Sequence, residues 1–459
     1  MFFSSILAVL TRNKWVQTKL AQYITEQVQT QLGVEVEIKA VEIDFLRNFH
    51  LEGILMRDLH KDTFLYVRTL NAQLQNWNLT QNAFDFNSIE LFAPLVKMGQ
   101  YESDSLLNYE EIFARLPKDT QTSKPVRLIF EGIALKNGTF VFFDGEEAFR
   151  KNITGEFNPS YLRYQKINAQ IPKGRMEYDG SLFFDIDHLN ALDRSGFFID
   201  DLSGPLRIIG SDVILPKLNI KTGETHLMGS FSIKKDPRKK GTYFQKFIYR
   251  LNLVDSKITL SDLSTFAPYL KEHSLKLQVN AEMIGPLANF KVNKLIATTA
   301  NGSRLNLNYR MTGLPNINEL FQTVSFKQSF VAQKDIQDMF QNETWASTLV
   351  PLGNVMLNLK CEIPTGSYSQ TGTMQTQTGN FEGFFEVDYK NIDSISPFVC
   401  RGQFSQIRSG IWGDSTQKID KISARVDIQG DRFDSSLNST FNIKQVSGFV
   451  NGGYVDNIS

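Results

Sequence analysis

The sequence predicts a mainly β protein with a repeating architecture, and three observations indicate it. Phenylalanine accounts for 36 of the 459 residues, and aromatic side chains favour half-buried β-strands. Apolar and polar residues alternate with a period of two through much of the second half, as they do in strands with one buried side. Two sequence markers also recur at nearly constant spacing. We therefore expect an elongated, repetitive β-sheet punctuated by short helices.

The N-terminal region, residues 1–33, predicts an amphipathic anchor helix. Apolar residues recur every four positions on one side of this helix, at Val16, Leu20, Ile24 and Val28. Gly33 follows, where helices commonly end. The apolar run over residues 1–10 is too short to span a bilayer, which takes about 20 residues, so we expect a truncated inner-membrane anchor. A signal peptide is the alternative, but its basic residues would precede the apolar run.

Residues 34–125 predict a second region, which is mostly β. We expect turns near Gly53 and at Lys61-Asp62, where glycine or polar residues interrupt the alternation. A strand follows over Ser88–Met98, and apolar residues at helical spacing over Asp104–Leu116 predict a short helix.

The third region, residues 126–459, predicts strand after strand. The polar segment Pro117–Pro125 ahead of it is bounded by prolines and indicates a loop or hinge. Asn137-Gly138 is a strong signal for a hairpin turn. The basic run Lys234–Lys240 lies between strand-like segments, and we interpret it as a solvated turn.

An internal repeat of about 75 residues divides this third region. One marker is an Asp-aliphatic start of a short helix, and the other is a Thr-Gly turn that opens a strand. The aspartates are Asp187, Asp262 and Asp335, 75 and 73 residues apart. The glycines are Gly223, Gly302 and Gly379, 79 and 77 residues apart. The chain ends at a similar glycine turn without a capping element, so we expect the repeat to be incomplete at the C-terminus.

The first strands and the helix before them resemble the start of TamB and AsmA-like envelope proteins, in particular the TamB-type proteins of the Bacteroidota. In that family an anchored helix leads into strands that end near an aromatic pair and continue into short motifs with conserved spacing. The resemblance covers residues 16–65. The matching positions are Val16, Gln17, Leu20, Ala21, Leu32, Gly33, Phe45, Leu51, Gly53, Asp58, Asp62, Thr63 and Leu65.

This resemblance implies a fold and a function. Proteins of this type form a β-taco, a long twisted sheet whose concave side is an apolar groove. Such a groove supports intermembrane phospholipid transport or the translocation and assembly of outer-membrane proteins. The resemblance implies an inner-membrane anchor with the bulk of the chain in the periplasm of a Gram-negative envelope. By analogy, a C-terminal region that this sequence lacks would contact an outer-membrane assembly barrel.

The residues of such a groove are predicted by alternation in the repeat units. Helices between the strands are too few to cover the apolar side, so a second sheet, closure of the sheet or a ligand must cover it. The resemblance favours phospholipid acyl chains as that ligand. The groove candidates are Leu275, Leu277, Val279, Leu305, Leu307, Val355, Leu357 and Leu359.

Other functional classes have little support in the sequence. The net charge is zero, whereas nucleic-acid binding proteins usually carry a basic excess. No HxH, HExxH, GxSxG or P-loop motif is present, so we predict no metal, no cofactor and no enzymatic activity. His50 interrupts a strand, but an outward-facing polar residue explains it. Cys361 and Cys400 lie in apolar surroundings and are interpreted as buried free thiols.

Three hypotheses follow from these observations. The first is an envelope protein with an apolar β groove that holds lipid. The second is a non-conducting structural β-repeat or scaffold protein, whose closed core would contain no lipid. The third is an enzyme on a β scaffold, which would require carboxylates or histidines to converge in a pocket.

Overall fold

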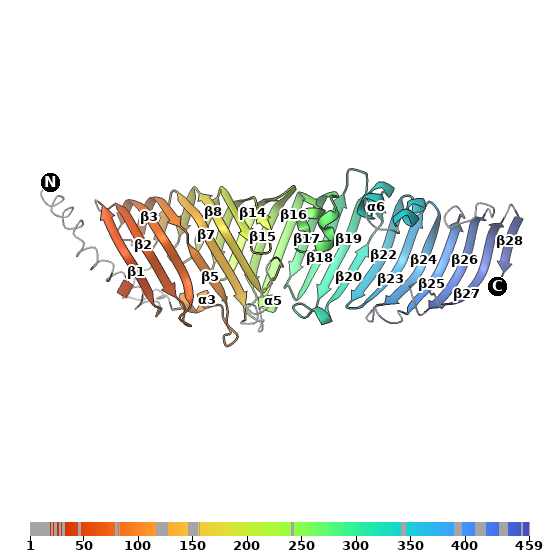
Figure 1. Cartoon of the computed structure of the whole chain (residues 1–459), viewed down its shortest axis with the longest axis horizontal. Helices are drawn as coiled ribbons and strands as arrows, with labels where there is room; N and C mark the ends of the chain where they lie inside the picture. The colour runs from red at the N-terminus through yellow and green to blue at the C-terminus, as the bar shows by residue number, and fades with distance from the viewer. Residues whose placement is uncertain are drawn as a thin grey trace. The chain divides into compact units, whose positions relative to one another are not determined.

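The computed structural model describes residues 33–458 except 45–46, 79–80, 82, 116–126, 146–154, 156, 240–242, 341–345, 390–396, 409–418, 431–438 and 451–452, together with residues 19, 22, 25, 26 and 29. These residues contain 28 strands and a few short helices, which confirms the prediction of a mainly β chain (Figure 1). The chain divides into unit 1, residues 1–246 and 262–268, and unit 2, residues 247–261 and 269–459.

Two predictions fall outside the described residues. The predicted loop Pro117–Pro125 does so entirely, and the anchor helix over residues 1–33 does so for all but a few positions. No helix among the described residues combines the length and the hydropathy needed to cross a bilayer. The membrane anchor therefore stays a prediction.

Unit 1 contains fifteen strands and two short helices among its described residues. The strands are β1 (Val36–Asp44), β2 (Asn48–Arg57), β3 (Thr63–Asn78), β4 (Ala83–Phe92), β5 (Leu95–Gln100), β6 (Arg127–Phe130), β7 (Ile133–Asp144), β8 (Tyr161–Ile171), β9 (Lys173–Met176), β10 (Leu182–Ile186), β11 (His188–Asp193), β12 (Phe198–Ile199), β13 (Asp201–Ile209), β14 (Asp212–Thr222) and β15 (Thr225–Lys235). The helices are α3 (Asn108–Phe113) and α5 (Tyr243–Lys246).

Strand pairing in unit 1 is antiparallel except at one crossover. β1, β2 and β3 form a meander, and β4 and β5 both pair with β3. The chain then passes through α3 and returns so that β6 and β7 run parallel to β4 and β5. Antiparallel pairing resumes from β7 through β15. A parallel return needs a connection that crosses the sheet. Helix α3 belongs to this connection, so it lies over strands that precede it in the chain.

Several sequence-predicted elements of unit 1 need correction. Asn137-Gly138 lies inside β7 and not in a hairpin turn, so that prediction is wrong. Asn137 has φ 53°, and the register against β8 shifts between Leu135 and Gly138, which is a β-bulge. Asn and Gly tolerate positive φ in a bulge as readily as in a turn. Gly53, at φ 63°, likewise lies within β2 and does not form the predicted turn, whereas the turn at Lys61-Asp62 is confirmed.

Two further elements differ in their bounds. The strand predicted over Ser88–Met98 is divided between β4 and β5 at Ala93-Pro94, where Ala93 has φ 48° and proline cannot donate to a ladder. The helix predicted over Asp104–Leu116 is confirmed in its centre as α3.

Unit 2 is an antiparallel meander of hairpins. Its strands are β16 (Phe247–Thr259), β17 (Lys276–Gly285), β18 (Asn289–Thr298), β19 (Arg304–Thr312), β20 (Phe321–Phe326), β21 (Ser329–Val331), β22 (Val355–Pro364), β23 (Ser367–Thr376), β24 (Gly379–Asp388), β25 (Phe398–Ile407), β26 (Ile419–Gly430), β27 (Ser439–Val450) and β28 (Gly453–Ile458). Its helical segments are η3 (Ile317–Glu319), α6 (Gln333–Phe340) and η4 (Ala346–Leu352). Along the chain, η1 (Leu260–Leu263) and η2 (Pro268–Glu272) span the division between the units.

The Thr-Gly markers of the repeat are confirmed as hairpin turns. Gly223 lies between β14 and β15, Gly302 between β18 and β19, and Gly379 opens β24 after the turn from β23. Two of the three Asp markers lie in short helices, Asp262 in η1 and Asp335 in α6. Asp187 lies between β10 and β11, so the helix predicted there is wrong.

Each helical Asp marker binds the hairpin turn that precedes it. In unit 1, Asp262 Oδ2 accepts hydrogen bonds from the Thr225 N–H at 2.8 Å and the Thr225 hydroxyl at 2.7 Å. In unit 2, Asp335 accepts from the Asn301 amide at 2.7 Å and from the hydroxyls of Thr299 and Ser303. The two markers that the sequence showed as separate signals therefore form one contact, which fixes a short helix to a turn.

Candidate functional site

The predicted groove residues of unit 2 lie on one side of its sheet. Residues directly opposite one another on neighbouring strands share a side, and we call such a row a rung. One rung consists of Val279, Ala297 and Leu305, and the next consists of Leu253, Ala281, Leu295, Leu307 and Phe326. Leu277 lies opposite Ile258 on β16, and Leu275 directly precedes β17.

The same side continues through the later strands. Val324 on β20 lies opposite both Tyr309 and Cys361, so β19 and β22 carry their apolar residues on a common side. From β22 onwards one rung consists of Leu357, Met374, Phe381, Phe404 and Ala424. We call this side of the strands the apolar face. The candidates on β17, β19 and β22 therefore lie on one side of the sheet.

The apolar face of unit 2 is only partly buried. Val279 and Val355 are 4% and 6% exposed, whereas the other predicted groove residues keep intermediate exposure: Leu275, Leu277, Leu305, Leu307, Leu357 and Leu359. Side chains in a sealed core between two packed sheets are usually fully buried. The face thus retains apolar surface that a ligand could cover.

A row of glycines shows towards which side these strands bend. Gly372, Gly383 and Gly402 lie directly opposite one another on β23, β24 and β25, in the rung between those of Leu357 and Cys361. A Cβ atom at Gly383 would lie 2.6 Å from the Cα atom of Gly402 and 2.2 Å from the carbonyl oxygen of Arg401. That Cβ would project from the apolar face. The backbone of the neighbouring strand, β25, must therefore bend towards the apolar face to come so close to it. We infer that the apolar face is the concave one here.

The two cysteines belong to this face as well. Cys361 and Cys400 lie in one rung with β23 and β24 between them, and both are free thiols, Cys361 buried and Cys400 half-buried. The interpretation as buried free thiols is therefore confirmed for Cys361, and in part for Cys400. Burial raises the pKa of both thiols.

Unit 1 has a corresponding apolar face. One of its rungs crosses six strands and consists of Ile43, Phe49, Ala72, Ile89, Ile133 and Ile171. Ile38 packs with Val41 and Ile43 although an even-numbered residue would face away in a regular strand. Ile38 lies opposite Ile54, and Gly53, the residue before Ile54, interrupts the pleat with φ 63°. The apolar side chains in both halves of β1 therefore lie on the same side of the sheet.

The opposite side of these strands is polar. Glu42, His50, Asn71 and Glu90 form a rung in which His50 Nδ1 lies 2.6 Å from Asn71 Oδ1. The hydrogen bond to Asn71 raises the pKa of His50, with a further contribution from Glu52. These side chains line a shallow, open depression. His50 is thus an outward-facing polar residue, as the sequence analysis expected.

Helix α3 covers one end of the apolar face in unit 1. Ile112 of α3 is 1% exposed and packs with Val34, Val36 and Phe64. The surrounding apolar contacts come from β2, β3 and β5 and from residues beside them: Met56, Leu59, Leu65 and Met98. Unit 1 thus has part of its apolar face buried under a helix.

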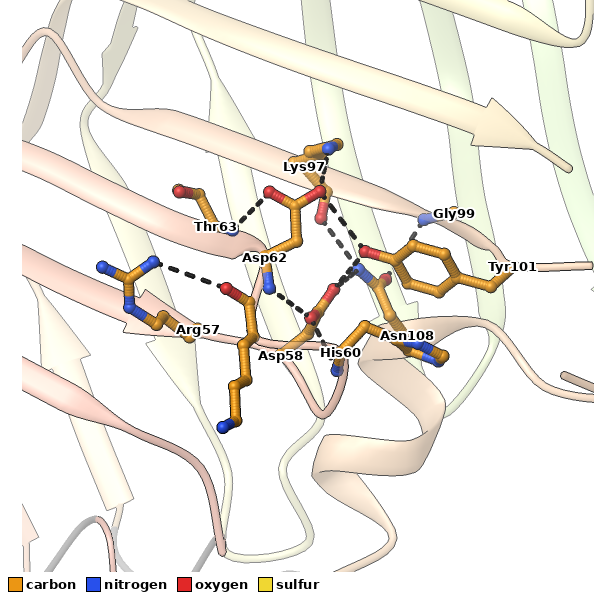
Figure 2. Close-up of polar contacts among 10 residues, drawn as sticks. Arg57, Asp58, His60, Asp62, Thr63, Lys97, Gly99, Tyr101 and Asn108 are labelled. Atoms are coloured by element: carbon orange, nitrogen blue, oxygen red, sulfur yellow. Dashed lines mark hydrogen bonds and ion pairs between the residues drawn. The ribbon is translucent and has the colours of Figure 1, made fainter. Parts of the chain in front are cut away.

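A buried carboxylate fixes the segment that leads into α3 (Figure 2). Asp58 is 3% exposed and accepts hydrogen bonds from the Tyr101 hydroxyl at 2.7 Å and the Asn108 amide at 3.2 Å. Its other oxygen accepts from the backbone N–H groups of His60 and Asp62, both at 3.0 Å. Burial, with the hydrogen bond to Asp58, raises the pKa of Tyr101 above its usual range. The bonds from Tyr101 and Asn108 tie the β2–β3 turn to the crossover, and the two backbone bonds close the turn itself.

The far side of α3 is held by charged residues from later strands. Glu110 Oε1 lies 2.5 Å from Lys235 Nζ at the end of β15 and accepts from the Ser211 hydroxyl at 2.6 Å. Burial alone would raise the pKa of Glu110, but the bonds from Lys235 and Ser211 lower it. Lys246 of α5, 7% exposed, donates to the Ser105 carbonyl at 2.7 Å and to Gln100 Oε1 at 3.2 Å.

Sequence reasoning did not identify this contact. The basic run Lys234–Lys240 was interpreted as a solvated turn, and Asp236, Arg238 and Lys239 do form a turn there. Lys235, however, reaches Glu110, which lies 125 residues earlier in the chain. Long-range pairs of this kind leave no periodic signal in a single sequence.

Within the part of the chain that the structure describes, no three His, Cys, Asp or Glu side chains converge in an arrangement suited to a metal ion. No protein-family model, curated protein or solved structure matches the chain. Function is therefore inferred from the geometry of the apolar face and from the resemblance in residues 16–65.

Proposed function

We propose that this chain is a TamB or AsmA-like envelope protein whose apolar face holds the acyl chains of phospholipids and supports their transport between membranes. The observation that carries the proposal is the apolar face of unit 2, which continues over successive strands and is partly exposed. The close contacts at its glycine row support a concave bend towards this face. Rungs of Leu, Val, Ile, Phe and Met offer hydrocarbon contacts without hydrogen-bonding groups.

Energetics support a hydrocarbon ligand. Two acyl chains with about 30 methylenes in total, at about 0.8 kcal/mol for each methylene, cost about 25 kcal/mol to expose to water. A strip of apolar side chains that remains in contact with these chains removes most of that cost. An apolar surface that continues over successive strands could serve as a path because a lipid would stay covered as it moves.

The cellular setting of the proposal comes from the resemblance alone. It includes an inner-membrane anchor at the N-terminus and a location in the periplasm of a Gram-negative envelope. It also includes contact with an outer-membrane assembly barrel, and support for outer-membrane protein assembly as a related activity.

Mass spectrometry of lipid extracted from the natively purified chain tests the proposal. The chain should be produced in a host with membranes and compared with a Leu277→Asp, Leu307→Asp double variant. Both leucines lie on the apolar face with intermediate exposure, so each Asp charge would contact the acyl chains. We expect phospholipid in stoichiometric amount on the unaltered chain and its loss from the folded variant.

The matched control is a Gln278→Asp, Asn308→Asp double variant. It introduces the same two charges one residue further along the same strands, β17 and β19, where side chains face the polar side. This control should retain its lipid. A well-folded, lipid-free unaltered chain would contradict the proposal and favour the non-conducting structural β-repeat.

A further inference from the structure

Helix α3 is too short to be stable by itself. Isolated helices in water are marginal below about 12 residues, and α3 contains only six. Contacts on two opposite sides must therefore hold it in place. One side is the apolar cluster of Ile112 with Val36 and Phe64, and the other is the polar contact of Glu110 with Lys235.

These two sides together have the chemistry of an anionic lipid. Ile112 places hydrocarbon on the apolar face of β1 and β3, as an acyl chain would. Glu110 places a carboxylate against the ammonium group of Lys235 and the hydroxyl of Ser211, as a head group would. The two groups are two residues apart on one helix, so both lie within reach of a single fatty acid.

We propose that α3 is a displaceable plug, which occupies a binding site for an anionic, acyl-chain-bearing lipid in unit 1. Lys235 and Ser211 are the head-group ligands of this site, and Val36 and Phe64 belong to its acyl-chain surface. The inference deepens the proposed function and depends on it, since it adds a charged head-group site to an apolar face.

Charge favours an anionic head group over a neutral one. Lys235 is half-buried, and without Glu110 its ammonium group would have no comparable carboxylate partner among the described contacts of its side chain. Asp212 accepts from the backbone N–H of Lys235 and pairs with the side chain of Lys234. A carboxylate or phosphate would restore the charge-assisted hydrogen bond that Glu110 makes.

A fluorescent fatty acid tests the site in the full chain. The probe is cis-parinaric acid, and its methyl ester serves as the uncharged comparison. A Glu110→Gln variant keeps the shape of the helix but removes its charge, so the acid no longer competes with a carboxylate for Lys235. We expect the Kd of the acid to fall by about tenfold or more, with a smaller change for the ester.

Two variants distinguish loss of the head-group contact from a general loosening of α3. Glu111→Gln removes the same charge from the next residue of α3, which has no described contact with Lys235, and should leave the Kd of the acid unchanged. Glu110→Gln combined with Lys235→Gln should bind the acid and the ester equally. Hydrogen exchange over residues 105–115 reports whether α3 has loosened in each variant.

Both ways of failing can be distinguished. If the amides of α3 remain protected from hydrogen exchange in Glu110→Gln, the variant Ile112→Ala is tested next. It weakens the apolar contacts of α3, and we expect the same fall in the Kd of the acid. Unchanged acid affinity in a variant whose α3 exchanges faster would overturn the plug. Failure of the proposed function itself would show separately, as a well-folded unaltered chain that is purified without lipid.

Discussion

Units 1 and 2 expose their apolar faces to different extents. In unit 1 a crossover between parallel strands lays α3 on the face, and hydrogen bonds to Asp58 and Lys235 hold that segment. In unit 2 the strands follow one another as antiparallel hairpins, and the face keeps intermediate exposure along β17, β19 and β22. The strands of both units present similar rungs. Coverage is therefore decided by the connections between strands and not by the strands themselves.

The largest effect should follow from removing the carboxylate that holds the crossover of unit 1. Asp58→Ala would remove the acceptor that the Tyr101 hydroxyl and the Asn108 amide share, which leaves them only a long contact with Asp62, at 3.5 Å, and the Lys97 carbonyl, at 3.2 Å. We expect a loss of about 3–4 kcal/mol in the free energy of unfolding, measured by urea denaturation. Glu102→Ala, at an exposed position nearby, should change stability by less than about 0.5 kcal/mol.

Hydrogen exchange shows which part of the chain loses stability in this variant. In Asp58→Ala the amides of α3 should exchange faster, while those of β22–β25 in unit 2 should not. Equal acceleration in both units would show that the two faces do not differ in how they are held.

A smaller effect should follow from filling the glycine row of unit 2. In Gly383→Ala the new methyl group would meet the backbone of Arg401 and Gly402, which cannot move aside as a side chain does. We expect a loss of about 2–3 kcal/mol in the free energy of unfolding. Gly132→Ala in unit 1 is the matched change, because its nearest neighbour would be a carbonyl oxygen at 3.5 Å. Similar losses at both glycines would argue against a bend at the row.

The smallest effect concerns the contact between turn and helix in unit 2. Asp335 is 3% exposed, and although burial alone would raise its pKa, the hydrogen bonds from Ser303, Thr299 and Asn301 lower it. We expect Asp335→Ala to cost about 2 kcal/mol at pH 7, by urea denaturation. Asp338→Ala, at a half-exposed position of the same helix, should cost less than about 1 kcal/mol.

The pH dependence of this loss follows from the direction of the shift. A carboxylate whose pKa is lower in the folded than in the unfolded state stabilises the fold above the unfolded-state value, near 3.9. That contribution disappears as the pH falls through the folded-state pKa. The difference between the unaltered chain and Asp335→Ala should therefore shrink below about pH 4. A difference that stays constant down to pH 2 would contradict the assigned role of Asp335.

Much of unit 2 could be predicted from the sequence because its structure is local. Alternation in Leu275–Met283 and Val355–Ile363 indicated which residues share a side, and Gly302 and Gly379 marked two of the hairpin turns. The bend at Gly372, Gly383 and Gly402 was not predicted, since the register that aligns three strands is not visible in any one of them.

Unit 1 was harder to predict for two physical reasons. Asn137-Gly138 has the same residues whether it forms a turn or a bulge, and only the pairing with β8 distinguishes them. The α3 contacts join Glu110 to Ser211 and Lys235, which are distant in sequence, and no repeat or period connects them.

The bulges within strands have a consequence for how such a chain can change over time. Inserting one residue into a regular strand turns every later side chain to the opposite side of the sheet. In β16, Asp255 at φ 48° already accommodates one extra residue, since Leu253 and Ser256 keep partners two positions apart on β17. Asn137 in β7 and Gln406 in β25 lie at similar shifts in register. A bulge absorbs one residue without changing the register of the strand beyond it. At these positions the gene could therefore gain or lose a codon while the apolar side chains stayed on the apolar face.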